Sequence, residues 1–394
     1  MLKNKVVFFS FIIFLSTIFI AVFNYKVDSL KVFHIEDYMM LRDIPNNLLP
    51  FYIHQYKNKK NDTLLMGYSE PVSCFYNVNN KIFFNGLTLT KSAYNFMYNH
   101  LEEYLKLHKE TKKVIFILSY NGFFYDQSEE ISDYNYYKAL LYFLFSTDIT
   151  SKNIDKILKN NLIQDKNKNK TITPVKETQH NHRLYILPYL VPHFSTHDKK
   201  DFYNNVMNNL KSWEKIIKLL KEKNIDYEII IPPYNALYLT IIKDKGCYNY
   251  VNIIKKFLVE KADVVHDFAF VNRITSIDIT SPDNCWYFSP DHPNSFFGNK
   301  LLIFLFFRQY ADKNLYMELN KNNIDKQLKK QEDLFNDYIK RKKPYIDNYL
   351  KELSKVNPVD YKIYINEDKM LNGIIQDNDL LKYHTENFSK RNFD

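Results

Sequence analysis

The chain has 394 residues, an apolar fraction of 45% and a formal net charge of +9 from 54 basic and 45 acidic side chains. This length suits one large domain with extensions or two modest ones, and the apolar content is enough for a real core. Because the basic residues are scattered rather than grouped into a stripe, the charge does not indicate a nucleic-acid partner. The aromatic fraction of 16% fits an A/T-rich coding genome better than a glycan-binding surface.

The N-terminus carries an uncharged apolar run at residues 6–23, preceded by Lys3 and Lys5. A membrane-spanning helix needs about 20 apolar residues. A signal peptide is the competing interpretation, but its apolar core is usually shorter and the sequence after this run is a poor cleavage site. We therefore expect a single-pass anchor at residues 1–26. The short basic N-terminus should stay in the cytoplasm, which puts the rest of the chain on the periplasmic or extracellular side.

The three cysteines, Cys74, Cys247 and Cys285, allow one disulfide at most and exclude a disulfide scaffold. No Cys/His pair has the spacing of a zinc site. We expect neither a metal nor a cofactor.

After a linker at residues 27–60, predicted strands and helices alternate. The predicted strands are residues 63–67, 81–86, 112–122, 225–235 and 262–268, and the predicted helices are residues 92–110, 202–224 and 249–261. Continuous apolar strands separated by helices indicate a parallel sheet with both faces covered. We predict an α/β domain at residues 61–310, a three-layer α/β/α structure of the flavodoxin-like kind.

Two further regions interrupt or follow this pattern. Residues 126–200 are irregular, with one apolar helix at residues 137–145 and a polar, lysine-rich segment that is either a solvated loop or a lid. Residues 311–394 read as a mixed-charge helical extension with a weak tail.

Polar and glycine residues mark the ends of the first three predicted strands. Gly67-Tyr68-Ser69 follows the first, Gly86 ends the second and Asn121-Gly122 ends the third. Ligands of an open parallel sheet bind outside these carboxyl ends. Far downstream, His292 precedes another predicted helix.

These residue types suit nucleophilic catalysis. A serine hydroxyl needs a histidine base within hydrogen-bond reach, and the oxyanion that forms needs backbone N–H or amide donors. Each residue has a structural alternative as well: Ser69 could cap a helix, Gly86 and Asn121 could form turns, and His292 could lie on the surface.

The order of serine, glycine, asparagine and histidine resembles the SGNH (GDSL-like) hydrolase superfamily. The α/β-hydrolases are less similar, because their nucleophile lies in G-x-S-x-G and the sequence GYSEP lacks the last glycine. The resemblance implies Ser69 as nucleophile, His292 as general base, and an oxyanion hole formed by Ser69, Gly86 and Asn121. The family's orienting aspartate usually lies three residues before the histidine, where this chain has Ser289. Asp291, Asp283 or a backbone carbonyl could orient the imidazole instead.

The anchor, the long segment after the third predicted strand and the sequence SPDHPNSFFGNKLL are similar to the envelope-anchored branch of this superfamily, which includes DltD-like and alginate-acetylation-type proteins. This resemblance implies a serine acyltransferase or esterase acting on O-acyl groups of a cell-envelope polysaccharide. It also implies an acyl donor and a membrane-bound O-acyltransferase as partners. The alternative is a non-catalytic scaffold that binds a polymer or the membrane partner.

Overall fold

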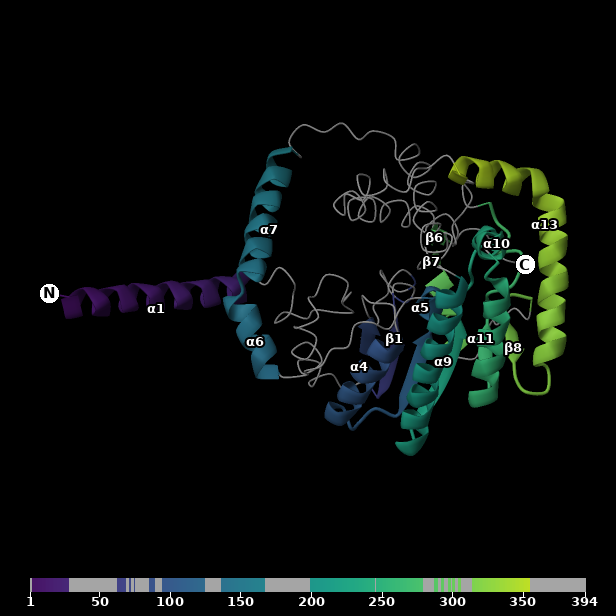
Figure 1. Cartoon of the computed structure of the whole chain (residues 1–394), viewed down its shortest axis with the longest axis horizontal. Coiled ribbons are helices and arrows are strands. Elements are labelled where there is room, and N and C mark those ends of the chain that lie inside the picture. Colours follow the sequence, from purple (N-terminus) through teal and green to yellow (C-terminus); the bar gives the residue numbers. More distant parts are fainter. Residues whose placement is uncertain are drawn as a thin grey trace.

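A computed structural model provides the three-dimensional structure of the chain. It describes residues 2–27, 62–68, 71, 74, 85–88, 94–124, 136–166, 199–244, 246–278, 287–289, 292–293, 297–298, 300–301, 304–305 and 314–354. Figure 1 shows a sheet with packed helices, and α1 (Leu2–Val27) extending away from it.

The central sheet has six strands in the order β2-β1-β3-β4-β5-β8. These are β1 (Thr63–Gly67), β2 (Asn85–Thr88), β3 (Lys113–Ile117), β4 (Asp226–Ile231), β5 (Val265–Asp267) and β8 (Met317–Leu319). The first five in this order pair in parallel, whereas β8 is antiparallel to β5. The prediction of an α/β fold is confirmed, and the predicted parallel sheet is found to be mostly parallel, with one antiparallel strand. The sixth strand lies after residue 310, in the segment predicted as a helical extension.

Both faces of the sheet are buried, because successive strand residues join two different apolar clusters. Leu64 and Met66 of β1 belong to one cluster, which also contains residues of α4 (Tyr94–Leu107), α9 (Lys199–Glu222) and α11 (Tyr248–Lys261). Leu65 belongs to the other, which contains Cys74 and the helical residues Phe297, Leu301, Phe304 and Leu305. This double burial explains why the strand sequences are continuous apolar runs.

The second and third strands differ from the prediction. β2 begins at Asn85 and ends at Thr88, whereas the apolar run predicted it at residues 81–86, of which 81–84 lie outside the described residues. The pairing with β1, rather than local hydrophobicity, sets its position: Leu87 lies opposite Met66. β3 ends at Ile117, five residues before the predicted end.

Several helices confirm the sequence patterns and three were not predicted. The confirmed set includes α6 (Tyr136–Phe145) and the long C-terminal α13 (Ile324–Ser354). The unpredicted helices are the short α5 (Asn121–Phe124), α7 (Thr147–Lys166) and α10 (Ala236–Asp244). Residues 236–242 of α10 are all buried, so this helix lacks the polar face that a periodicity argument requires.

The N-terminal helix contains a 21-residue apolar stretch, Val7–Val27, that is long enough to cross a membrane. Its length and composition are compatible with either a membrane anchor or a signal sequence.

His100 provides a pH-dependent element of the fold. It is fully buried in α4, with Nδ1 at 2.8 Å from the carbonyl oxygen of Phe96. Burial lowers the pKa of His100 to about 4, although the Phe96 carbonyl raises it. Since the ordinary histidine pKa is about 6.5, the unfolded chain takes up a proton first, and stability is lost as the pH falls through this window.

We therefore expect the free energy of unfolding to fall by up to about 3 kcal/mol between pH 6.5 and pH 4 through this residue. Urea unfolding in detergent, followed by circular dichroism at several pH values, measures this slope. The His100→Gln variant should lose this part of the slope, and an unchanged slope in that variant would contradict the assignment.

Candidate active site

The carboxyl ends of β1 and β3 lie side by side at the point where the strand order reverses. From β1 the chain runs outward to β2 and then returns to β3 on the other side of β1. Gly67 and Ile117, the last residues of β1 and β3, are register partners. Ligands of open α/β sheets bind in the crevice at such a switch point, so the residues that follow Gly67 and Ile117 are the first candidates for a site.

Gly67 is required here by close approach of the backbone. A Cβ atom at this position would collide with the ring of Pro71 and lie 2.7 Å from the carbonyl oxygen of Ile117. The chain after β1 therefore folds back over the strand end, and both Tyr68 and Pro71 are buried there. Ser69 itself lies outside the described residues.

Asn121 begins the short helix α5 (Asn121–Phe124), four residues after the end of β3, and is half-buried. Its Oδ1 atom accepts a hydrogen bond of 2.6 Å from the hydroxyl of Tyr238, a fully buried residue of α10. This bond sets the orientation of the amide, because the two N–H donors on Nδ2 must then point away from Tyr238.

Two buried tyrosine hydroxyls hold the turn that carries Asn121. The Tyr94 hydroxyl donates to the Ser119 carbonyl at 2.7 Å and accepts from the Ser119 N–H at 3.1 Å. The Tyr234 hydroxyl accepts from the Tyr120 N–H at 3.0 Å and donates to the carbonyl of residue 118 at 3.2 Å. Beyond the end of a strand, these backbone groups have no partner in the neighbouring strands. The two tyrosine hydroxyls provide the hydrogen bonds instead.

The ring of Tyr120 stacks on that of Tyr234, with ring centroids 4.9 Å apart and planes 24° apart. Burial, with a smaller effect from Asp267, raises the pKa of Tyr120 well above its ordinary value. This phenol therefore stays neutral, and the side chain that precedes Asn121 carries no charge.

His292 lies on a two-stranded ladder apart from the main sheet. The ladder joins β6 (Tyr287–Ser289) to β7 (His292–Pro293) in antiparallel fashion, with Ser289 as the register partner of His292. His292 is half-buried. Asp291 and Asp283 lie outside the described residues.

This ladder packs against the segment that follows β1. The Cys74 thiol lies 3.8 Å from the carbonyl oxygen of Pro293, and both residues are buried. A Cβ atom at Gly298 would collide with the Cys74 carbonyl group, so the helical segment after β7 also touches this backbone directly. Residues more than two hundred positions apart in the sequence therefore meet beside the carboxyl end of β1.

Gly86 was predicted to end the second strand, but it lies within that strand. It is the second residue of β2 and the register partner of Leu65, whereas Thr88 is level with Gly67. Because Gly86 sits inside the ladder, two residues before the carboxyl end, the geometry does not favour its N–H as an oxyanion donor.

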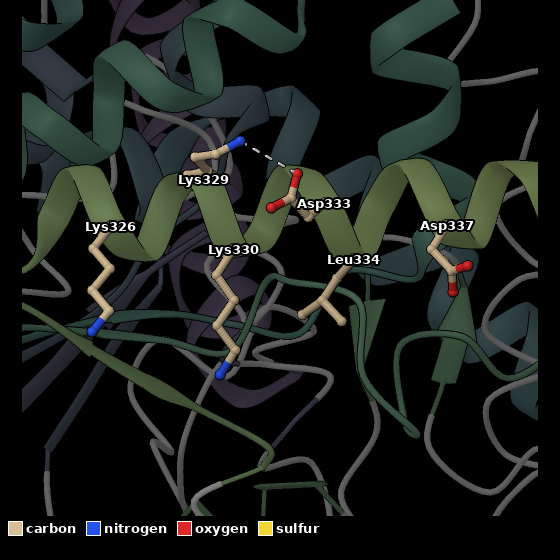
Figure 2. A pocket seen from close by; sticks show the side chains of 6 residues that line it. All are labelled: Lys326, Lys329, Lys330, Asp333, Leu334 and Asp337. Atoms are coloured by element: carbon tan, nitrogen blue, oxygen red, sulfur yellow. Dashed lines mark ion pairs between the residues drawn. The ribbon is translucent and has the colours of Figure 1, made fainter.

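A separate hollow of about 520 Å³ lies along α13. Figure 2 shows the side chains that line it, which all come from this one helix: Lys326, Lys329, Lys330, Asp333, Leu334 and Asp337. Lys329 and Asp333 form an exposed ion pair of 3.6 Å. It contains none of the predicted site residues, and we interpret it as a solvated helix face. Within the described ranges, no group of three or more His, Cys, Asp or Glu side chains could hold a metal ion.

Comparison with known proteins leaves the chain unassigned to a family. No family model matches it, and neither a curated protein nor a solved structure is significantly similar.

Sequence reasoning missed the roles of Tyr94, Tyr234 and Tyr238. Because tyrosine is abundant in this chain, the sequence does not show which individual tyrosines hold the turn and the Asn121 amide. The one local signal was the position of Tyr234, directly after the Pro232-Pro233 stop of β4, because a residue there must lie at the same edge of the sheet as Asn121.

Proposed function

We propose that the chain is a membrane-anchored serine acyltransferase or esterase of the SGNH type, acting on O-acyl groups of a cell-envelope polysaccharide. One observation carries this proposal: Cys74, five residues after Ser69, packs against Pro293, which adjoins His292. The chain neighbours of the serine and of the histidine thus meet beside the switch point. Asn121 lies after the adjacent strand, with its amide oriented by Tyr238.

The topology supports the finer fold assignment within this proposal. The order β2-β1-β3-β4-β5 is that of flavodoxin-like sheets. Apolar clusters on both faces agree with a three-layer α/β/α arrangement, in which α4, α9 and α11 form one layer and the helical residues after β7 the other.

In the proposed reaction, the Ser69 hydroxyl attacks the carbonyl carbon of an acyl ester and gives its proton to His292. The oxyanion is stabilised by the Ser69 N–H and the Asn121 amide. The intermediate then expels the donor alcohol, which takes the proton from His292, and an acyl-serine remains. A sugar hydroxyl or water attacks this ester in turn, with His292 again as base.

The anchor assignment draws support from Asn24, near the end of α1. This side chain is fully buried, and it donates to the carbonyl oxygen of Leu144 at 2.9 Å and to the Thr150 hydroxyl at 3.0 Å. Cleavage after the apolar stretch would remove Asn24 and break these bonds, which favours an uncleaved anchor. Lys3 and Lys5 then favour an orientation with the bulk of the chain outside the cytoplasm.

Labelling with a fluorophosphonate probe tests the proposed nucleophile. We expect the full chain in detergent to be labelled, and the Ser69→Ala variant to lose the label. Ser73→Ala provides a matched control in the same segment and should keep it. Labelling of Ser69→Ala at the normal rate would refute the assignment of the nucleophile.

Variants of Asn121 and Tyr238 should lose turnover to different degrees. Asn121→Ala should lower the turnover of a small aryl ester by about 10²–10³, the usual effect of removing one oxyanion donor. Tyr238→Phe keeps the ring but loses the hydroxyl that orients the amide, so we expect a smaller loss of about tenfold in kcat. In the double variant, Tyr238→Phe should add little, because Tyr238 acts through Asn121. Equal, additive losses would contradict this order.

Hydrolysis and transfer differ in their acceptor. Release of acetate from a small aryl ester without any sugar would identify an esterase. Acetate release that rises only with added polysaccharide, together with acylated polymer, would identify a transferase.

The register of His292 favours one alternative function. Its ladder partner is Ser289, so this chain has no carboxylate at that position. A non-catalytic scaffold that binds the polymer or a membrane acyltransferase would need none. Absence of fluorophosphonate labelling, combined with retained polymer binding in Ser69→Ala, would support this scaffold.

A further inference from the structure

The exposed apolar side chains outside α1 are concentrated on α6 and α7. Among the described residues beyond α1, eight large apolar side chains are exposed, and six of them lie on these two helices: Tyr137, Leu141, Phe145, Ile154, Ile157 and Leu158. Their exposed fractions range from 39% to 73%. The other two, Tyr203 and Ile253, occur singly on α9 and α11, as is normal for a protein surface.

On each helix these residues form one stripe. Tyr137, Leu141 and Phe145 are spaced four residues apart, so they follow one side of α6. Ile154 and Leu158 are likewise four apart on α7, with Ile157 beside them. Stripes of this kind mark an interaction surface rather than scattered exposure.

The two helices are fastened to the end of the apolar helix α1. Besides its bonds to Leu144 and Thr150, the buried Asn24 side chain accepts a hydrogen bond of 3.0 Å from Nδ2 of Asn153, also fully buried. Asn24 lies three residues before the end of the membrane-length stretch Val7–Val27. The site where α6 and α7 attach is therefore at one end of that stretch.

The dimensions place this attachment at the membrane boundary. A helix of 21 residues is about 31 Å long, and the hydrocarbon core of a bilayer is about 30 Å thick. Figure 1 shows α6 and α7 running crosswise to α1 from their junction with its end. With α1 along the membrane normal, α6 and α7 lie along the membrane surface.

We propose that α6 and α7 bind the surface of the phospholipid bilayer beside α1, with their apolar stripes at the boundary between headgroups and acyl chains. α1 is itself exposed along its apolar stretch, where Phe8, Phe14 and Phe19 are more than 60% exposed, and its Asn24 end is bonded to both helices. A bilayer covers all three helices at once, whereas a protein partner or a second copy would have to match two separate stripes. The amphipathic character of α7, with Lys152 and Lys156 away from its stripe, is typical of interfacial helices.

Such a contact has a consequence for the whole protein. One spanning helix leaves a domain free to rotate and tilt about its tether, whereas a second, lateral attachment restricts its orientation to the membrane. This inference does not depend on the proposed catalytic function, because its readout is lipid contact rather than activity.

Site-specific photo-crosslinking tests the proposal on the full chain in native membranes. p-Benzoylphenylalanine is placed at position 141 or 158, with position 14 in α1 as the positive control and position 253 on α11 as the exposed negative control. We expect mass spectrometry to find phospholipid adducts at 141 and 158 with yields approaching that at 14, and at least about tenfold above that at 253. All four positions are exposed, so the substitutions should preserve the fold.

Two outcomes would overturn the proposal. Adducts at 141 and 158 with a second protein or another copy of this chain, in place of lipid, would assign the stripes to a protein interface. Absence of lipid adducts at both positions, while position 14 gives them, would show that the stripes do not reach the bilayer.

Discussion

Replacement of His292 with alanine is expected to lower aryl-ester turnover by a factor of about 10⁴ or more. Without the imidazole, the serine hydroxyl keeps its proton at neutral pH and the leaving alcohol has no acid. The full chain in detergent, assayed with a small aryl acetate, gives this factor directly. The expectation rests on the proposed function and on the ladder that carries His292 beside the segment after β1.

A structural effect of this change has to be separated from a chemical one. The thiol–carbonyl contact between Cys74 and Pro293 involves no atom of the His292 side chain, so the ladder should persist in the variant. Added imidazole should then restore part of the lost turnover in His292→Ala, whereas it should not help Ser69→Ala. Turnover within about tenfold of the unaltered protein would show that His292 is not the base.

The strands of the sheet could be predicted where local hydrophobicity and strand pairing agree. β1 and β4 lie within their predicted ranges, because each is an apolar run bounded by a glycine or by the Pro232-Pro233 pair. β2 could not be placed, because its register depends on Leu64–Gly67 of another strand. β8 is only three residues long and forms by pairing with β5, so no periodic pattern in its own sequence predicts it.

The sequence indicated which strand ends carry the candidate residues, but not the hydrogen bonds and contacts that hold them. The alternation of strands and helices was enough to place Asn121 after a central strand. Its orientation depends on Tyr238, more than a hundred residues away, and no local pattern encodes such a hydrogen bond. The same holds for the Cys74–Pro293 contact, which is a property of the packed fold. The roles predicted for Ser69, Gly86, Asn121, Asp291 and His292 remain predictions.

Replacement of Lys255 with methionine is expected to lower the free energy of unfolding by about 3–5 kcal/mol. The Lys255 ammonium group lies 2.7 Å from Oδ2 of Asp267, and the two side chains are 1% and 0% exposed. Gln331 of α13 bonds to both, which ties the C-terminal helix to α11 and β5. The variant would leave the Asp267 carboxylate buried without its cation. Urea unfolding in detergent, followed by circular dichroism, measures the loss.

The chain contains a matched control one residue away. Lys256 lies at the same distance, 2.7 Å, from a carboxylate oxygen of Asp325, but these side chains are 56% and 81% exposed. Lys256→Met should therefore change the free energy of unfolding by less than about 1 kcal/mol. The contrast isolates burial, since residue type and distance are shared. Similar losses in the two variants would show that burial does not govern the strength of these pairs.

A second variant separates the attraction within the buried pair from the cost of leaving one charge alone. Burial lowers the pKa of Lys255 even though Asp267 raises it, which means that desolvation outweighs the attraction for the lysine. Lys255→Met combined with Asp267→Asn removes both charges and retains a side chain that can accept from the Ala269 N–H, as Asp267 does now at 2.9 Å. We expect this double variant to be more stable than Lys255→Met alone. If it is instead less stable, the Asp267 carboxylate stabilises the fold even without Lys255, through the hydrogen bonds that it accepts from Gln331 and the Ala269 N–H.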